Sequence, residues 1–319
     1  MASRIPLDRC WILSGATASG KTELGLLLAE RLDGEILSLD SMSVYRLMDI
    51  GTAKPDAQQR GRVPHHLIDL VWPDEPYSLA RYLDDAEAAV RDVLSRGKTP
   101  IFVGGTPLYL KALLRGIFEG PPADPALREA LRKEAESHLP GRLHAELAKV
   151  DPESAARLHP NDTKRLIRAL EVYRLTGRPI SELQREFDRP VPARECRVFV
   201  LDWDRDELAE RIARRVNRMF AEGLVEEVAR IQAGPHPLGP TASQAIGYRE
   251  VLDHLAGSFD LDRCRELTIR HTRQFAKRQR TWFRSLSECR FVPVSADTDW
   301  TALAQEIAAG GERFLAEDA

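Results

Sequence analysis

The segment that most constrains this chain is Gly15-Ala16-Thr17-Ala18-Ser19-Gly20-Lys21-Thr22, which fits the pattern GxxxxGK[ST]. An apolar run, Trp11–Leu13, precedes it, and a helical pattern from Leu24 to Ala29 follows it. A loop placed between a strand and a helix turns backbone N–H groups toward an anion, and the helix N-terminus adds partial positive charge. Lys21 adds a full charge, and the Thr22 hydroxyl can ligate Mg²⁺. The segment therefore predicts a binding site for a di- or triphosphate.

Further apolar runs end in polar or glycine-rich turns, as strands of a parallel sheet do. They are Ile36–Leu39 before Asp40, Ile101–Val103 before Gly104-Gly105-Thr106, Val198–Leu201 before Asp202 and, more weakly, Phe291–Val294. Ligands of open α/β sheets bind outside the carboxyl ends of the strands, so the turns at Gly15, Asp40 and Thr106 are expected to meet at one crevice. The expected fold is a P-loop NTPase-like parallel sheet flanked by helices.

Residues 119–195 differ in character from the rest of the chain. No strand pattern occurs there, and nine prolines separate short helical segments. We expect an all-helical lobe over 119–195, inserted into an α/β catalytic core formed by residues 1–118 and 196–319. The later part of this core adds two long helical patterns, Arg205–Glu222 and Asp262–Leu286.

Composition excludes several protein classes. The chain has 319 residues, 43% hydrophobic and 30% charged, which is typical of soluble globular proteins. No apolar run approaches the ~18 residues of a membrane helix, and the N-terminus lacks signal-peptide features. We therefore expect a cytoplasmic monomer without a membrane partner. The spacing of Cys10, Cys196, Cys264 and Cys289 predicts neither disulfides nor a zinc site, and His65-His66 are interpreted as packing or hydrogen-bonding residues.

The loop alone leaves its chemistry open. In an NTPase or kinase, Asp40 would be the acidic partner of Mg²⁺. The NKxD element of a GTPase is absent from the sequence. A third class of enzyme uses diphosphate as the leaving group and transfers the organic part of its substrate instead.

Segments spread over residues 15–284 resemble one family. After the loop they are, in order, Asp40-Ser41, VYR at 44–46, MDIGTAKP at 48–55, VPHHLID at 63–69, VGGT at 103–106, PND at 160–162, RALEV at 168–172, QAIGYR at 244–249 and KRQRTWFR at 277–284. This ordered set resembles the tRNA dimethylallyltransferases (tRNA isopentenyltransferases), in the bacterial form without a C-terminal zinc finger. The chain departs from the usual pattern at Ala16 (Pro), Ser43 (Gln or another polar residue), Leu47 (Gly) and Pro107 (Gly). Because Pro107 has no N–H, the turn after Thr106 is expected to be polyproline-like or a helix start.

The resemblance implies a reaction. The family transfers dimethylallyl from dimethylallyl diphosphate to N6 of adenosine 37 in tRNAs that read codons beginning with U. Two alternatives stay open: an adenylate isopentenyltransferase or P-loop small-molecule kinase, and a non-catalytic NTP-dependent RNA-binding protein. A free-nucleotide enzyme has no evident use for a basic helix, and a pure binder has none for Asp40 beside a diphosphate loop.

Two polar residues at strand ends are expected to act on the acceptor. The exocyclic amine of adenine is a weak nucleophile, so a neighbouring group must accept its proton as the new C–N bond forms. Asp40 is the expected acceptor, with an N-cap or Mg²⁺ ligand as the alternative. Thr106 is expected to position the amine or the diphosphate, with a plain N-cap of the next helix as the alternative.

Cations beyond Lys21 are expected at the leaving diphosphate, whose negative charge grows in the transition state. In the pattern Arg205–Glu222 the residues Arg211, Arg215 and Arg218 lie apart from an apolar stripe. The resemblance places an arginine of this helix at the diphosphate. We assign Arg215 to catalysis and Arg211 to diphosphate binding, with a solvated face as the alternative.

The segment 262–290 carries nine Lys/Arg and three Asp/Glu, a net charge of +6 in a chain of net charge −3. Helical spacing predicts a buried stripe of Cys264, Leu267, His271, Phe275, Trp282 and Leu286 and an opposing cationic face of Arg270, Arg273, Lys277, Arg280 and Arg284. Such a face suits a phosphate backbone, with a solvated surface as the alternative. The resulting tRNA-binding set, intended for an anticodon stem-loop, is Ser41, Met42, Ser43, Lys164, Arg165, Arg168, Gln244, Gly247, Tyr248, Arg249, Arg273, Lys277, Arg278, Arg280 and Arg284.

Overall fold

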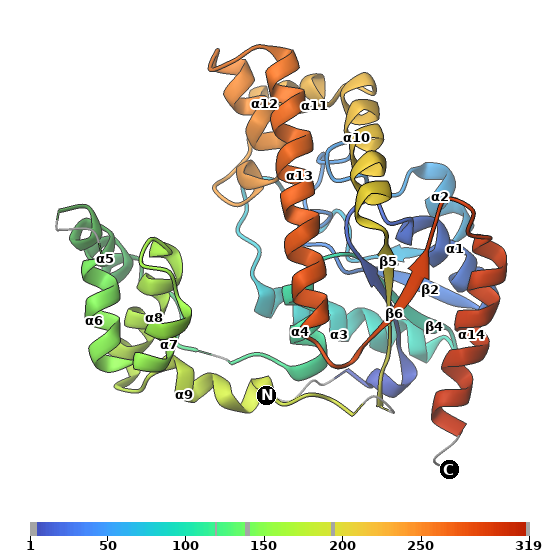
Figure 1. The fold of residues 1–319 in the computed structure, drawn as a ribbon, viewed down its shortest axis with the longest axis horizontal. Helices are drawn as coiled ribbons and strands as arrows, with labels where there is room; N and C mark the ends of the chain where they lie inside the picture. Colours follow the sequence, from blue (N-terminus) through green and yellow to red (C-terminus); the bar gives the residue numbers. More distant parts are fainter. Residues whose placement is uncertain (1–4, 119, 138–140, 193–194, 317–319) are drawn as a thin grey trace. The chain divides into compact units, whose positions relative to one another are not determined.

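The computed structural model describes residues 5–118, 120–137, 141–192 and 195–316 (Figure 1). The described residues divide into two compact units. Residues 115–189 form the first, which we call the helical unit, and residues 5–114 with 190–316 form the second, the sheet unit. These bounds begin and end a few residues before the 119–195 expected from the sequence.

The sheet unit is built on one six-stranded sheet in the order β3-β2-β4-β1-β5-β6, with every neighbouring pair parallel. The fold class expected from the sequence is confirmed, and the five apolar runs each form a strand. The two-residue strand β3 was not predicted, because it is too short for an alternating pattern. The strands are β1 (Trp11–Gly15), β2 (Gly34–Ser38), β3 (His65–His66), β4 (Thr99–Val103), β5 (Arg197–Trp203) and β6 (Cys289–Val294).

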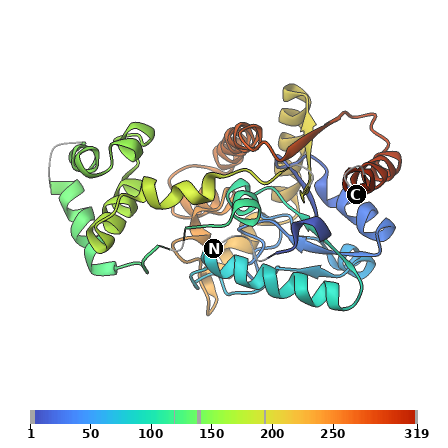
Figure 2. The same ribbon diagram turned by 90° about the horizontal axis from the view of Figure 1, so that it is seen from below.

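Helices cover both faces of this sheet. Apolar side chains of α1, α10 and α14 form one core with β1, and those of α3, α4 and the end of α13 form the other. Figure 2 shows α14 beside α1, on which it packs. The helices are α1 (Lys21–Arg31), α2 (Ala57–Arg62), α3 (Leu79–Ser95), α4 (Pro107–Arg115), α10 (Arg205–Ala221), α11 (Leu224–Ala233), α12 (Tyr248–Leu255), α13 (Leu261–Arg284) and α14 (Trp300–Ala316), with 3₁₀ turns at Leu7–Arg9 and Ala242–Gln244.

A third core lies beside the sheet and fixes the segment after β2. Val44, Tyr45 and Met48 are buried against residues of α11, α12 and the start of α13. The segment 41–55 therefore has its own apolar support, although it contains no regular helix or strand.

Every element described within the helical unit is helical, as the sequence predicts. The unit packs around its own apolar core, which includes Leu131, Leu147, Leu166 and Leu170. Its elements are α5 (Pro125–Ser137), α6 (Arg142–Val150), α7 (Pro152–Arg157), α8 (Thr163–Thr176), α9 (Ile180–Gln184) and a 3₁₀ turn at Arg185–Asp188. None of the helices in the described parts of the chain combines the length and apolar character needed to cross a bilayer.

The long helix α13 begins one residue before the expected Asp262, and the side chain of its N-cap Asp260 accepts a hydrogen bond from the Arg263 N–H at 2.8 Å. Its buried face differs from the predicted one. The buried residues are Cys264, Thr268, Ala276, Gln279 and Phe283, whereas Leu267, His271, Phe275 and Trp282 are half-buried. The prediction is correct for Cys264 and for Leu286, which follows the helix. It missed the polar Thr268 and Gln279, because His271 was the only polar residue placed on the stripe.

Candidate active site

The turns after β1, β2 and β4 meet at one cavity of about 1120 Å³ in the sheet unit. Its lining combines the segment Thr17–Thr22, the segment Asp40–Ser43 and the turn Gly104–Thr106. Side chains of α10 and α13 and the segment 244–247 complete the wall. The structure thus brings together the strand ends that the sequence singled out.

The glycine-rich loop bends sharply before α1. Gly20 has a φ of +93°, in the left-handed region that glycine tolerates, and α1 begins at Lys21. The Lys21 Nζ donates to the carbonyl oxygens of Gly15 at 2.9 Å and Ala16 at 2.7 Å. Burial and, to a smaller extent, the neighbouring Arg215 lower the pKa of Lys21 to about 7, although Asp40 opposes the change. An anion in the loop would favour the charged ammonium.

Side chains from distant segments hold the loop backbone. The Gln279 Oε1 accepts a hydrogen bond from the Thr17 N–H at 3.0 Å, and the Trp203 indole N–H donates to the Ser19 carbonyl at 2.8 Å. Arg211 donates to the Ala18 carbonyl at 2.9 Å, and its guanidinium lies 4.1 Å from the centroid of the Trp203 ring. Neither Gln279 nor Trp203 was predicted from the sequence as a site residue. Gln279 lies inside the quoted segment 277–284, which was the available signal.

A second tryptophan, Trp300 of α14, packs against the loop at Gly20. A Cβ added at Gly20 would lie 2.7 Å from the Trp300 ring, so only glycine fits there. Helix α14 therefore supports the loop from the side away from the cavity, and this contact had no signal in the sequence.

Asp40 and Thr106 lie on neighbouring strand ends and both line the cavity. The Asp40 Oδ1 accepts a hydrogen bond from the Met42 N–H at 2.8 Å, which orients the carboxylate. The Thr106 Oγ1 accepts from the Ser41 N–H at 3.1 Å. The hydroxyl of Thr106 thus keeps its proton for donation.

Pro107 is the first residue of α4, which decides between the two turn conformations expected after Thr106. The Thr106 carbonyl accepts from the Leu110 N–H at 3.1 Å, so it begins the helical hydrogen bonding. Because the Thr106 hydroxyl is bound to the Ser41 N–H, its contact links β4 to the Asp40 segment.

Four arginines of α10 line the cavity, namely Arg211, Arg214, Arg215 and Arg218. The predicted apolar stripe of this helix is buried at Leu208, Ile212, Val216 and Met219. Burial lowers the pKa of the Arg215 guanidinium, and the nearby Asp40 carboxylate opposes that shift. The Arg211 Nε is bound to the loop backbone. Arg215 is the α10 cation whose charge acts on both Lys21 of the loop and Asp40.

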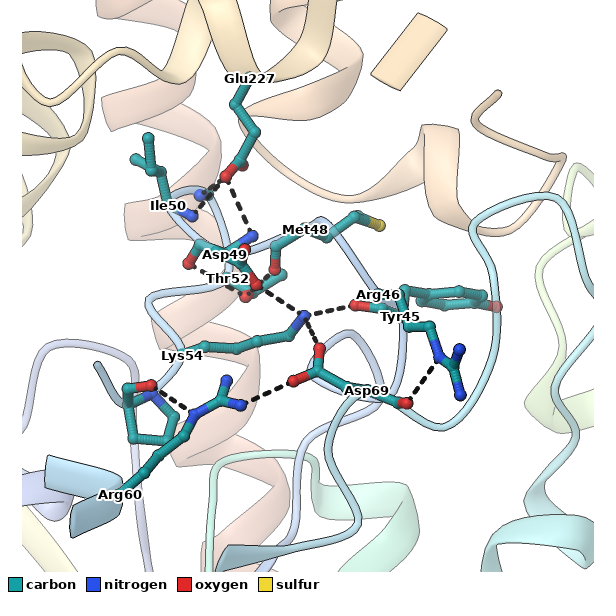
Figure 3. Close-up of polar contacts among 12 residues, drawn as sticks. Tyr45, Arg46, Met48, Asp49, Ile50, Thr52, Lys54, Arg60, Asp69 and Glu227 are labelled. Carbon is teal, nitrogen blue, oxygen red and sulfur yellow. Dashed lines mark hydrogen bonds and ion pairs between the residues drawn. The ribbon is translucent and has the colours of Figure 1, made fainter. Parts of the chain in front are cut away.

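The segment 48–55 is held by a buried polar network (Figure 3). The buried Glu227 carboxylate accepts hydrogen bonds from the Ile50 N–H at 2.8 Å and the Asp49 N–H at 3.1 Å. The Lys54 ammonium pairs with Asp49 at 3.0 Å and with Asp69 at 2.7 Å. These residues of the family-like segments therefore fix the backbone of one cavity wall.

The tRNA-binding set is only partly assembled at the cavity. Residues that line it are Ser41, Met42, Ser43, Gln244, Gly247, Arg249 and Arg278. Tyr248 does not, because its ring is fully buried and its hydroxyl donates to Glu227 at 2.6 Å. The assignment of Tyr248 to tRNA contact is therefore corrected to a structural role beside the cavity wall.

The cationic face of α13 is also partly used inside the protein. Arg280 and Arg284 pair with Asp202 at 3.0 and 3.3 Å, and Arg273 donates to the Ala209 carbonyl of α10 at 3.2 Å. Lys277 is exposed, and its ammonium has no hydrogen bond or ion pair with the residues that the structure describes. The five cations are thus not equivalent, since helical spacing predicts their face but not their partners.

In the helical unit, the three basic candidates of α8 also differ. Lys164 is exposed, Arg165 pairs with Asp162 at 3.2 Å, and Arg168 pairs with the buried Glu171 at 2.6 Å. Burial raises the pKa of Glu171, but hydrogen bonds from Arg128 and Arg168 outweigh it and lower the value to about 2. Arg168 therefore stabilises this unit in addition to any role on its surface.

The oxygen ligands available for a metal ion are few. Within the described ranges, no three or more His, Cys, Asp and Glu side chains gather as a metal site. The Thr22 hydroxyl and the Asp40 carboxylate line the same cavity and are hard oxygen donors. They fit a Mg²⁺ ion that takes further ligands from substrate phosphate. His66 instead bonds Glu35 at 2.6 Å and His65 bonds the Val63 carbonyl, as interpreted from the sequence.

A parallel sheet, a glycine-rich loop before a helix and a carboxylate beside the arginines of α10 define a P-loop-like α/β protein. Residues 43–286 match the family model described as IPP transferase, and the chain belongs to this family. The resemblance found in the sequence is thereby confirmed.

Similar proteins extend the match to almost the whole chain. The tRNA dimethylallyltransferase of Pelotomaculum thermopropionicum is 47% identical over 317 residues, which cover 99% of this chain and 100% of that protein. The protein of the same name from Rhodopirellula baltica is 50% identical over 291 residues, 89% of this chain and 87% of that protein.

Two solved structures are similar in fold. A full-length tRNA isopentenylpyrophosphate transferase from Bacillus halodurans is 37% identical, with a TM-score of 0.70 and coverage of 97% of this chain and 98% of that chain. A eukaryotic dimethylallyltransferase described as acting on tRNA is 29% identical, with a TM-score of 0.79 and coverage of 97% and 79%.

Proposed function

We propose that the protein transfers the dimethylallyl group from dimethylallyl diphosphate to N6 of adenosine 37 in tRNAs that read codons beginning with U, and releases diphosphate. The observation that carries the proposal is the single cavity that combines the anion loop with Asp40, Thr106 and Arg215. Membership of the IPP transferase family and the names of the similar proteins support it.

The chemical step joins an amine to an allylic carbon. The N6 lone pair forms a bond to C1 of the dimethylallyl group while the C1–O bond breaks, and that electron pair leaves on the diphosphate. The Asp40 carboxylate accepts the N6 proton, which otherwise opposes bond formation. Its oxygen is held toward the cavity wall by the Met42 N–H at 2.8 Å. The Thr106 hydroxyl donates to the amine or to the diphosphate.

The leaving diphosphate is stabilised by fixed positive charge. Backbone N–H groups of the loop, the Lys21 ammonium and the Arg215 guanidinium surround it, in a part of the cavity where burial strengthens each interaction. Arg211 contributes by holding the Ala18 carbonyl of the loop. The Thr22 hydroxyl, together with substrate oxygens, would hold a Mg²⁺ ion, and that ion would supply positive charge at the diphosphate.

The acceptor adenosine flips out of the anticodon stack into the cavity. Cavity-lining residues that would contact it and its neighbours are Ser41, Met42, Ser43, Gln244, Gly247, Arg249 and Arg278. The exposed Lys277 and, on the helical unit, Lys164 are the freest of the candidate cations for phosphate contacts. We assign the helical unit, whose expected bounds were 119–195, to holding the anticodon stem-loop.

One incubation tests the function. The protein is mixed with Mg²⁺, dimethylallyl diphosphate, AMP, ATP and unmodified tRNA. The tRNA is then separated from the free nucleotides and digested to nucleosides, and both fractions are analysed by mass spectrometry. A prenyl adduct on adenosine supports the proposal. An adduct on free AMP alone would indicate an adenylate isopentenyltransferase, and ATP consumption without an adduct would indicate a kinase.

A further inference from the structure

Gln279 of α13 is a buried polar side chain whose two ends bind two different turns of the cavity. Its side chain is 3% exposed. The Oε1 accepts from the Thr17 N–H at 3.0 Å, and the Nε2 donates to the Gly105 carbonyl. The amide therefore bridges the loop after β1 and the turn after β4, which lie far from it in sequence.

The Gln279 amide packs closely against Gly105, so the bridge tolerates little displacement. A Cβ added at Gly105 would lie 2.8 Å from the Gln279 Nε2 and 3.5 Å from the Lys21 Nζ. If the bridge is lost, the buried Gly105 carbonyl and the partly buried Thr17 N–H lose this partner, which is costly above all for the carbonyl. The position of α13 is thus tied to the path of the loop backbone beside Lys21.

The same helix carries the proposed tRNA contacts. Arg278 lines the cavity directly before Gln279, and Lys277 is exposed one residue earlier. On the same helix, Arg273 donates to the Ala209 carbonyl and Arg280 pairs with Asp202. A shift of α13 under a bound polyanion therefore reaches the loop through the Gln279 amide.

We propose that Gln279 is a positioning residue through which α13 sets the conformation of the diphosphate loop, so that tRNA on α13 and diphosphate in the loop strengthen each other's binding. The tRNA part rests on the proposed function. Gln279 lines the cavity, but both of its polar ends are bound to backbone groups, so the proposed effect on substrate passes through Thr17 and Gly105.

The test measures binding, not turnover. Calorimetry gives the affinity for inorganic pyrophosphate with Mg²⁺, with and without unmodified tRNA, and the affinity for tRNA with and without pyrophosphate. The wild-type protein should show the same enhancement in both directions, at least about 5-fold, because coupling is reciprocal. In Gln279→Met, pyrophosphate affinity should fall by about 10-fold, the value of one net hydrogen bond, and the enhancement should disappear.

A matched control and a second variant keep the result decisive. Gln232 is exposed on α11 and away from the cavity lining, so Gln232→Met should bind both ligands as the wild type does. In Gln279→Glu the carboxylate keeps an acceptor for Thr17 but cannot donate to Gly105. Its pyrophosphate affinity should therefore fall, and the enhancement should disappear as in Gln279→Met.

The outcomes are distinct. Wild-type pyrophosphate affinity in Gln279→Met, or enhancement that survives the substitution, would overturn the proposal. If thermal melting shows that Gln279→Met is unfolded, Gln279→Glu decides, and an enhancement that survives in that variant overturns the proposal. Because no prenyl transfer is measured, an absent adenosine adduct would remove the proposed function and leave the pyrophosphate result standing.

Discussion

Helices α10 and α13 both present arginines at helical spacing, but the side chains of the two helices have different partners. On α10, four arginines line the cavity, and Arg215 lies near Asp40 and Lys21. On α13, Arg280 and Arg284 share Asp202, and Arg273 binds the α10 backbone. The same sequence pattern thus supplies charge to a cavity in one helix and holds neighbouring elements together in the other.

The difference between the two helices shows how much a pattern of charged residues can predict. Spacing predicts that charged side chains share a face, because residues three and four apart are neighbours on a helix. Whether that face meets a ligand depends on what the rest of the chain places opposite it. For α13 the deciding residue is Asp202, which follows the apolar residues of β5 and carries no signal that it faces another helix.

The largest expected effect is at the Asp40 carboxylate, which lines the cavity together with side chains of α10 and α13. Asp40→Asn should lower turnover by about 10² to 10⁴, the range for loss of a general base, while tRNA affinity stays unchanged. Single-turnover prenyl transfer and a tRNA binding assay measure the two quantities. An Asn variant that transfers dimethylallyl at the wild-type rate would exclude Asp40 as the proton acceptor.

The next prediction compares the helices directly. Arg215→Met on α10 should lower the rate constant at saturating substrates by about 10² to 10³, because it removes a buried charge from the leaving group. Arg273→Met on α13 should change that rate by less than about 10-fold, since the side chain gives one hydrogen bond to a backbone carbonyl. Equal losses in the two variants would contradict the distinction drawn here between cavity and surface arginines.

How much of this arrangement the sequence predicts depends on the range of the interaction. The loop 15–22 and the strand runs are local patterns, and each lies where it was expected. Gln279 and Trp203 were missed because their partners in the loop lie in a distant part of the chain. Tyr248 was wrongly assigned to tRNA contact for a related reason, because the sequence of a motif does not show whether a tyrosine within it is buried.

The pH dependence of diphosphate binding follows from the cations that meet at Lys21. Burial and Arg215 lower the Lys21 pKa to about 7 in the free protein, and a bound anion raises it. Below pH 7 the ammonium is already charged, whereas above pH 7 a proton must be taken up on binding, so affinity should fall by up to about 10-fold per pH unit. Pyrophosphate titrations from pH 6 to pH 9 measure this fall.

Lys21→Arg is the matched variant for that titration, since a guanidinium keeps its charge over the whole range. The slope that remains in this variant belongs to pyrophosphate itself and to other groups. If wild type and Lys21→Arg lose affinity in parallel, the titration of Lys21 is excluded as the cause.

The smallest expected effect separates two cations on α13. Each phosphate contact releases counterions, so the logarithm of the tRNA binding constant falls with the logarithm of salt by about 0.7 to 0.9 per contact. Lys277→Ala should flatten this slope by about that amount, because the ammonium is exposed and has no partner in the described parts of the chain. Arg280→Ala should flatten it less, since Asp202 already neutralises the guanidinium at 3.0 Å. Binding measured at several salt concentrations for two equally stable variants gives both slopes. If the slopes of the two variants equal the wild-type slope, this face of α13 is solvated and α13 meets the tRNA through its cavity side at Arg278.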